Sequence, residues 1–392
     1  MADLIITSSV YDGESLGAIP YPILPGATEA LEYYTDVLPA YTNGAEERAQ
    51  LRALPRQYYK HSLATNFDQM REVHNALRAN LRNRWLIPEW FQAQRVSGVV
   101  AGQTVFPVDT LIHDLRANTH ALLWKGYCDW QIVDVDTITA TTITLSTPAA
   151  FAGSVLIVPF RVGRVSGSAK MSPSGWDDQF DLEYYVDDVL GGLTETPAQL
   201  NGQDYYTTPY VLDERNSTQL DWEEDQVEYV LGGIDSMTPW TRSMYTYQYN
   251  FDDSGPEAYW ELKQWWYRRA GKFRPFYSPT FESDLQKRST GTVTNTFQFQ
   301  DEGYTAHLYP TLNRLGFLLK NGTWLARTVT AASNIGGGLG QVTLNAALNV
   351  AARDIERVSF ILFNRLNTDR LELNLQAHGR FTTNASVLEI PE

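Results

Sequence analysis

The chain has 392 residues, of which 43% are hydrophobic and 20% are charged, and its formal net charge is −15. A chain of this length can bury a large core without disulfides or metals, and it has room for two or three domains. The acidic balance argues against a nucleic-acid-binding surface, because such a surface needs basic groups that displace the counterions of the phosphates.

The sequence shows neither a signal peptide nor a membrane segment. Met1–Leu4 are not followed by the basic stretch and apolar run of a signal peptide. No apolar run approaches the roughly 18 residues that a membrane span requires. We therefore expect a protein made and folded in a cytoplasm. Cys128 is the only cysteine, and its neighbours Tyr127 and Trp130 favour a small core residue over a nucleophile.

One pattern occurs twice along the chain, and it is the main feature of the sequence. In each occurrence a turn leads to a Pro-Tyr pair, and an acidic, tyrosine-rich stretch then leads to the same tripeptide. Order and residue type agree over most of the chain, so we interpret the pattern as an internal duplication. The matching segments are Asp12-Gly13 with Asn201-Gly202, Pro20-Tyr21 with Pro209-Tyr210, and Asn66-Phe67-Asp68 with Asn250-Phe251-Asp252.

An amphipathic helix is predicted after each tripeptide, over about 68–84 and about 256–270. In both segments the apolar residues recur at spacings of three and four, which places them on one helical face. Pro256 suits the first turn of the second helix, where a proline loses no helical hydrogen bond. The residues that share a face are Met70, Val73, Leu77 and Leu81 in the first helix, and Tyr259, Leu262 and Trp266 in the second.

An aromatic segment with a central proline follows each helix. Pro88 and Pro279 stop the helix and force an extended step, so the aromatics around them should pack back on a sheet. We expect Trp85, Trp90, Phe276 and Phe281 to be largely buried. These segments and the end of the second helix supply the candidate structural and assembly residues: Trp85, Pro88, Trp90, Trp265, Trp266, Phe276, Tyr277, Pro279 and Phe281.

Strand signals fill the remainder of each copy, over 95–165 and 290–392. The glycine-rich run at 336–340 is predicted to be a hairpin tip, because no helical pattern follows it. Leu371, Leu373 and Leu375 alternate with polar residues, which is typical of a half-buried strand. An internal strand is favoured there over an edge that pairs with a neighbouring subunit.

These elements predict an α+β protein, mainly β, built from two tandem copies of a small β-sandwich or barrel unit with one principal amphipathic helix each. The first unit is expected over 1–170 and the second over 171–392, with the boundary in a loosely patterned stretch at 165–200. The aromatic segment from Trp176 to Tyr185 is expected to be the lead-in strand of the second unit.

No pattern typical of an enzyme, a cofactor site or a metal site is present, so we predict no catalytic, cofactor-binding or metal-ligating residue. The six histidines are scattered, and no GxSxG segment or phosphate-binding loop occurs. The acidic clusters at 177–178, 187–188 and 221–225 are interpreted as surface. They leave open a glycosidase, which needs two carboxylates, and a calcium site, although 221–225 lacks the EF-hand spacing.

Three segments resemble the distal-tail and other tail-tip proteins of long-tailed bacteriophages. The first is Gly271–Pro279, which follows a tryptophan-rich helix. The second combines Glu46-Glu47-Arg48 and Leu54-Pro55-Arg56 before a tyrosine-rich strand, and the third is the ending Ser359–Asp369. The general character of the sequence resembles these proteins over most of the chain. The simplest distal-tail pattern, however, contains the unit once rather than twice.

The resemblance implies a structural virion protein without enzymatic activity or cofactor, located in the tail tip or baseplate. Its implied role is a ring that joins the tail tube protein to the hub and to other tail-tip or fibre proteins. Three copies of a two-unit chain would present six similar units and adapt sixfold to threefold symmetry; six copies are the alternative. A receptor- or glycan-binding module of a tail fibre and a carbohydrate-active enzyme stay open as other functions.

Overall fold

The computed structural model describes residues 4–7, 11, 13–39, 45–65, 67–172, 178–188, 197–208, 218–222, 224–229, 232–238, 242–376 and 379–391. The fold is α+β and mainly β, as the sequence patterns predicted. The described residues up to 188 are called the N-terminal half, and those from 197 are called the C-terminal half.

Strands interrupted by one α-helix make up the N-terminal half. Its elements are β1 (Ile5–Thr7), β2 (Ser15–Ala18), β3 (Ala27–Glu32), β4 (Thr35–Pro39), β5 (Glu46–Gln50), β6 (Arg56–Thr65), α1 (Phe67–Asn80), β7 (Arg84–Pro88), the 3-10 turn η1 (Trp90–Gln92), β8 (Gln94–Val99), β9 (Val105–Pro107), β10 (Thr119–Gly126), β11 (Asp129–Ile138), β12 (Thr142–Leu145), β13 (Gly153–Val165), β14 (Lys170–Ser172) and β15 (Asp178–Val186).

The C-terminal half has the same alternation of strands around one α-helix. Its elements are β16 (Gln199–Leu200), β17 (Gln203–Asp204), β18 (Gln219–Asp221), β19 (Asp225–Glu228), β20 (Ile234–Met237), β21 (Met244–Ser254), α2 (Pro256–Arg269), β22 (Phe276–Pro279), β23 (Thr292–Val293), β24 (Thr296–Gln300), the π-helical turn η2 (Tyr304–Leu308), β25 (Arg314–Leu319), β26 (Trp324–Gly336), β27 (Leu339–Leu344), β28 (Val350–Ala351), the 3-10 turn η3 (Ala352–Asp354), β29 (Ile355–Leu366), β30 (Arg370–Leu375) and β31 (Arg380–Glu389).

A central antiparallel sheet of eight strands runs through both halves, in the order β14-β15-β6-β3-β30-β31-β21-β18. Strands β3 and β30 meet in its middle, so this pair joins the two halves. Side chains of β30 and β31 alternate between buried and more exposed positions, as expected for strands that cover a core with one face. The central sheet therefore has an inner face, which packs on the core, and a polar outer face.

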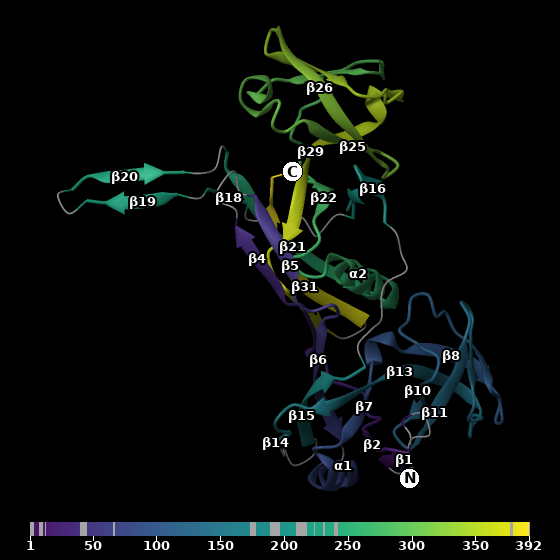
Figure 1. Ribbon diagram of the computed structural model, residues 1–392. Coiled ribbons are helices and arrows are strands. Elements are labelled where there is room, and N and C mark those ends of the chain that lie inside the picture. The colour runs from purple at the N-terminus through teal and green to yellow at the C-terminus, as the bar shows by residue number, and fades with distance from the viewer. Residues whose placement is uncertain are drawn as a thin grey trace.

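Each half also carries a smaller sheet, called its end sheet. The N-terminal end sheet has the order β8-β13-β10-β11-β12-β9, and the C-terminal one has the order β29-β25-β26-β27-β24. The long strands β13 and β29 also pair with β15 and β31 of the central sheet. Figure 1 shows the two end sheets far apart, one at the top of the view and one at the lower right.

The same scheme of strand pairings occurs in both halves. β7 pairs with β13 and β15 with β6, as β22 pairs with β29 and β31 with β21. β10 pairs with β11 and β13, as β25 pairs with β26 and β29. The parallel pairing of β2 with β7 has a counterpart in the parallel bridge between Tyr205 and Tyr277. Positions in the two halves can therefore be matched through their strand registers.

The predicted helix at 68–84 is too long at its C-terminal end. α1 ends at Asn80, and the amide of Asn83 donates a hydrogen bond to the carbonyl of Asn80 at 2.9 Å to form a turn. The chain is extended from Arg84 because these residues pair with β13. The predicted helix at 256–270 agrees with α2 to within one residue, and Ala270 ends it in a left-handed conformation.

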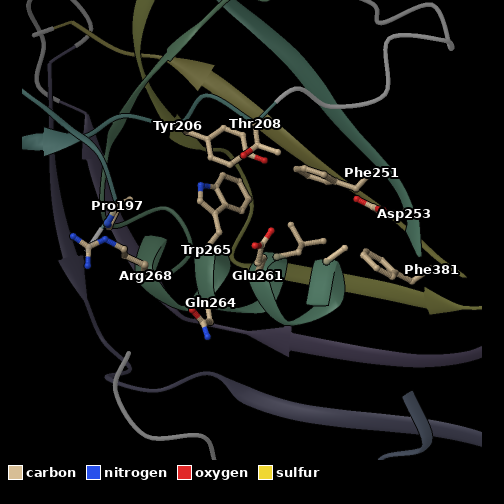
Figure 2. Close-up of a pocket in the computed structure, with 12 residues that line it drawn as sticks. Pro197, Tyr206, Thr208, Phe251, Asp253, Glu261, Gln264, Trp265, Arg268 and Phe381 are labelled. Atoms are coloured by element: carbon tan, nitrogen blue, oxygen red, sulfur yellow. The ribbon is translucent and has the colours of Figure 1, made fainter. Parts of the chain in front are cut away.

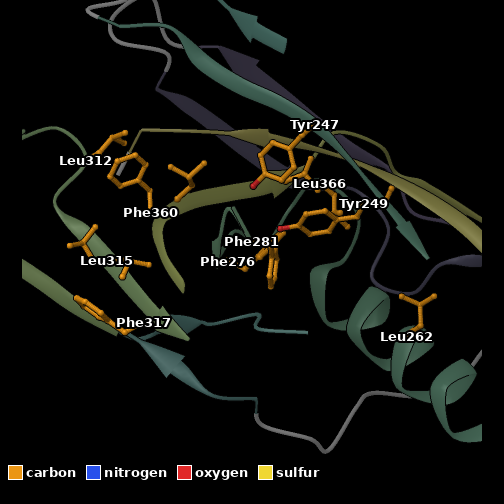
Figure 3. Packing of buried hydrophobic residues seen from close by; sticks show 14 of the residues in the cluster. Tyr247, Tyr249, Leu262, Phe276, Phe281, Leu312, Leu315, Phe317, Phe360 and Leu366 are labelled. Carbon is orange, nitrogen blue, oxygen red and sulfur yellow. The ribbon is translucent and has the colours of Figure 1, made fainter. Parts of the chain in front are cut away.

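Burial of the aromatic segments after the helices is confirmed for Trp85, Phe276 and Phe281. Figure 3 shows Phe276 and Phe281 near Tyr249 of β21 in the core of the C-terminal half. Trp90 is less completely buried than these three residues but packs against a core cluster. It begins the η1 turn, and its ring packs edge-on against that of Trp124 at a centroid distance of 5.7 Å.

Two further predictions need correction. Cys128 is exposed rather than a core residue, because it lies in the turn between β10 and β11. β15 is not the lead-in strand of the second half, because it pairs with β6, β13 and β14 of the first. Strand pairing therefore places β15 with the N-terminal half. Trp176 lies outside the described residues.

Two predictions about the end of the chain are confirmed. The glycine-rich run is a hairpin tip, because β26 ends at Gly336 and β27 begins at Leu339. β30 is an internal strand, paired with β3 on one side and β31 on the other. The alternating leucines at 371–375 are thus buried within the chain and do not form a free edge.

Candidate functional site

The junction between the halves is formed by the pairing of β3 with β30. β3 and β30 pair over six residues of each strand, from Ala27 opposite Leu375 to Glu32 opposite Arg370. Leu31 and Leu371 face each other on the inner side and are fully buried. The halves therefore share one continuous sheet and one core across this pair of strands.

A buried ion pair crosses the junction beneath the sheet. Glu29 lies on the inner face of β3 and is completely buried. The Nζ atom of Lys263, on α2 of the other half, lies 2.9 Å from Glu29 Oε1. Gln57 Nε2 donates a hydrogen bond to the same oxygen at 2.5 Å, and the Tyr259 hydroxyl donates one to Glu29 Oε2. Each Glu29 oxygen thus has a partner, which a buried carboxylate requires.

Further charges extend this pair into a row of alternating sign. Lys263 Nζ lies 3.7 Å from Glu89 Oε1, and Arg161 Nη2 lies 2.8 Å from Glu89 Oε2. Arg161 also pairs with the Asp114 carboxylate and donates a hydrogen bond to the Asp114 carbonyl at 2.8 Å. We call Glu29, Lys263, Glu89, Arg161 and Asp114 the buried charge row. All five residues are buried, so the row can hold elements together but cannot receive a substrate.

Mutual attraction keeps the cations of this row charged. Burial alone would lower the pKa of Lys263, but the carboxylates of Glu29 and Glu89 outweigh that effect and raise it. Burial alone would raise the pKa of Asp114, but Arg161 and Arg116 outweigh it and lower the pKa to about 2. Burial raises the pKa of Glu29, and Lys263 offsets part of that rise. The row is stable only while its partners remain together.

Sequence reasoning missed the charge row, although one signal for it was present. Lys263 lies on the apolar face of α2, four residues after Tyr259 and next to Leu262. A lysine on such a face must be paired when the face is buried. In the same way, Glu29 lies between Ala27 and Leu31 on one face of β3, at spacings of two residues. A charge at an apolar position of a periodic pattern is the feature that could have identified both residues.

The central sheet ends at β14 on one side and at β18 on the other. Within the described residues, β14 pairs only with β15, and β18 pairs only with β21. The strand registers match β18 to β3, with Leu220 at the position of Leu31. Leu31 is fully buried at the junction, whereas Leu220 is 58% exposed. An apolar residue suited to a sheet interior is therefore displayed at an open edge.

The opposite edge shows the same contrast. The registers match β14 to β30, with Met171 at the position of Leu373. Leu373 is buried in the junction, whereas Met171 is exposed. The two outer edges of the sheet thus correspond to the two strands that meet inside the chain.

The predicted assembly residues lie mostly in the interior. Most of them are buried within the chain, so they contribute to its core and are not displayed to a partner. Trp90 and Trp265 are the half-buried exceptions. The buried members are Trp85, Pro88, Trp266, Phe276, Tyr277, Pro279 and Phe281.

A pocket of about 290 Å³ with aromatic walls lies between α2 and β21 (Figure 2). Its wall includes Trp265, Tyr206 and Phe251 together with the carboxylates of Glu261 and Asp253. The Trp265 and Tyr206 rings lie 4.9 Å apart at a tilt of 35°. These two rings pack on each other and do not form a flat open shelf of the kind on which a sugar stacks.

The acidic clusters show no metal site in the part of the chain that the structure describes. No group of three or more His, Cys, Asp or Glu side chains is suitably placed for a metal ion among those residues. Asp187 pairs with Arg84 at 3.3 Å, and Asp221 accepts a hydrogen bond from the Thr246 hydroxyl at 2.5 Å. Asp177 lies outside the described residues. Within the described ranges, no helix is long and apolar enough to cross a bilayer.

We expect folding stability to depend on pH through His61. It is buried on the inner face of β6 between the rings of Tyr59 and Tyr184, and burial lowers its pKa to about 4. The unfolded chain binds this proton near pH 6.5, so stability should fall as the pH decreases from about 6.5 to about 4, by about 3 kcal/mol in all. Urea unfolding of wild type and His61→Gln across this range measures the effect. A difference between the two proteins that stays constant with pH would refute it.

Comparison with known proteins does not place this chain in a family. No protein-family model matches it, and a search of curated proteins gives no significant match.

Proposed function

We propose that this chain is a structural component of a bacteriophage tail tip or baseplate and that copies of it form a closed ring. In this proposal the chain consists of two tandem copies of one unit, and it acts through contacts with its own copies, the tail tube protein and the hub or fibres. The resemblance of Gly271–Pro279 and Ser359–Asp369 to tail-tip proteins suggests the location. The shared strand topology of the two halves supports the duplication.

The β3–β30 junction is the observation that supports the proposed ring. It is a head-to-tail contact, because β3 and β30 occupy different positions in the topologies of their halves. A contact between two different surfaces leaves one unused copy of each, here β18 and β14, which each pair on one side only among the described residues. Repetition of such a contact produces a ring when the rotation closes and a filament when it does not. The open edges of one chain therefore fit the edges of its neighbours.

Unpaired edges also favour self-association on general grounds. An edge strand displays a row of unpaired N–H and C=O groups that can pair with another strand. The exposed side chains of Leu220 and Met171 add apolar area that would be removed from water on contact. Three copies would give six units and match a sixfold tube, whereas six copies would give twelve.

The first test is the native mass of the purified full-length protein, with electron microscopy of the same sample. We expect a discrete ring of three or six chains. The trimer is refuted by six chains per ring. A protein that stays monomeric at every concentration would contradict self-assembly and would favour a glycan-binding module or a carbohydrate-active enzyme instead.

A disulfide ladder tests the register of the contact between copies. The junction pairs Ala30 with Glu372, and the matching positions at the open edges are Gln219 and Lys170. We expect a Gln219→Cys, Lys170→Cys variant on a Cys128→Ser background to form disulfides between chains under mild oxidation. The Cβ atoms of directly opposite residues on paired strands are close enough for a disulfide bond. The ladder on a non-reducing gel should end at the number of chains in the ring.

A matched control separates this register from random collision. Gln219→Cys combined with Lys320→Cys places the second thiol in the exposed turn after β25, far from both edges in the topology. This control pair should give no ladder. An equal ladder from both variants would refute the edge contact.

A further inference from the structure

A hairpin of the C-terminal half extends away from the rest of the chain. Strands β19 and β20 pair with each other, from Asp225 opposite Met237 to Glu228 opposite Ile234. Every described side chain at 226–229 and 232–238 is exposed, and several are large and apolar. Figure 1 shows this hairpin projecting to the left of the molecule. We call β19, β20 and Trp222 at their base the arm.

The hairpin that follows β3 is not free in this way. β4 and β5 lie against the C-terminal half, where the amide of Thr35 donates a hydrogen bond to Asp369 Oδ2 at 2.9 Å. Arg365 Nη2 lies 3.0 Å from Glu46 Oε2. Thus the strand that makes the junction and the hairpin after it contact the same half.

The base of each hairpin carries an aromatic residue. Tyr33 directly follows β3, and Trp222 directly follows β18, so the registers match these two positions. Tyr33 is 3% exposed, and its hydroxyl donates a hydrogen bond to the carbonyl of Tyr267 at 3.2 Å. Trp222 is 61% exposed. A tryptophan exposed to this extent at the position of a buried tyrosine indicates a surface that is covered in an assembly.

Arg365, which pairs with Glu46 of the first hairpin, also has a counterpart in the N-terminal half. In β29, Asn364 pairs with both Phe276 and Glu389, and Arg365 is the next residue. In β13, Gly163 pairs with both Trp85 and Val186, and Arg164 is the next residue. The Arg365 side chain is 7% exposed beneath Glu46, whereas that of Arg164 is 53% exposed, with Asp187 3.4 Å from its Nε. Arg164 therefore has open surface around it.

Each hairpin carries one glutamate at the described strand pair nearest its tip. In the first hairpin Glu46 lies opposite Pro39, and in the arm Glu228 lies opposite Ile234. Glu46 is on the second strand of its hairpin and Glu228 is on the first strand of the arm, but the two glutamates belong to matching cross-strand pairs. An exposed carboxylate on the arm and an exposed guanidinium on the N-terminal half are complementary in charge.

We propose that the arm docks on the N-terminal half of a neighbouring copy of this chain, with Trp222 covered there and Glu228 paired with Arg164 of that copy. This inference rests on the proposed self-assembly and adds a second contact to it. The occupant is a second copy because the chain already holds one example of the contact, with β4–β5 against the C-terminal half. The arm of one copy then takes on its neighbour the place that β4–β5 takes within the chain.

A charge swap in the full-length protein tests the pairing. Glu228→Lys and Arg164→Glu should each raise the protein concentration at which half of the chains are assembled, by about tenfold. The double variant should restore much of the wild-type value. Trp222→Ala should weaken assembly without lowering the thermal stability of the protein diluted to single chains, because its side chain is exposed there. Glu356→Lys, on the exposed surface of β29, is the matched control and should have no effect.

Hydrogen exchange supplies an independent measurement. Amides at 225–229 and 232–238 should exchange more slowly in the assembled protein than after dilution to single chains. Rings that form normally in Glu228→Lys, Arg164→Glu and Trp222→Ala, with no slowing of exchange at the arm, would overturn the docking inference and leave self-assembly intact. A wild type that never assembles would overturn both, so the two failures are distinguishable.

Discussion

Lys263→Met should lower the free energy of unfolding by about 3–5 kcal/mol, because it leaves the buried carboxylates of Glu29 and Glu89 without their ammonium partner. The methionine fills a similar volume, so the loss measures charge rather than a cavity. Unfolding in urea, followed by tyrosine and tryptophan fluorescence, gives this free energy.

Two further variants make the cause of this loss testable. Lys320→Met removes a lysine from the exposed turn between β25 and β26 and should change stability by less than about 0.5 kcal/mol. Glu29→Gln in the Lys263→Met background removes one unpaired charge and should recover part of the loss. A Lys263→Met protein as stable as wild type would show that the charge row does not hold the halves together.

Trp266→Ala is expected to destabilise the protein by about 3–5 kcal/mol, because it deletes a fully buried indole from the core under α2. Leu111→Ala is the control, since it removes apolar atoms from an exposed side chain that takes no part in the proposed contacts between copies. The control should unfold at the wild-type denaturant concentration. Equal losses in the two variants would contradict the described packing of α2.

The fold class could be predicted because it depends on local periodicity. The apolar spacing in 256–270 gave α2 nearly to the residue, and the alternating leucines at 371–375 gave an internal strand. α1 was predicted too long because Arg84 to Pro88 are extended by their pairing with β13, and a helical pattern cannot reveal such a distant partner. Cys128 was misplaced because apolar neighbours do not reveal a two-residue turn.

The candidate site was harder to predict because it depends on distant pairs. Glu29 and Lys263 are separated by most of the chain and meet only through the β3–β30 junction. The recurrence of segments along the sequence predicted two similar units, but it contained no information on which strands would join them. The aromatic residues named as assembly candidates stand out by size, and large apolar side chains are usually interior.

Because the β3–β30 junction lies within one polypeptide, its closure does not depend on protein concentration. Its two strands are held at the high effective concentration that a covalent connection provides. Formation of the same contact between separate molecules must overcome the loss of their translational and rotational freedom. In a ring of three chains only every second joint carries that cost, so such a ring would persist at greater dilution than a ring of six separate units with identical contacts.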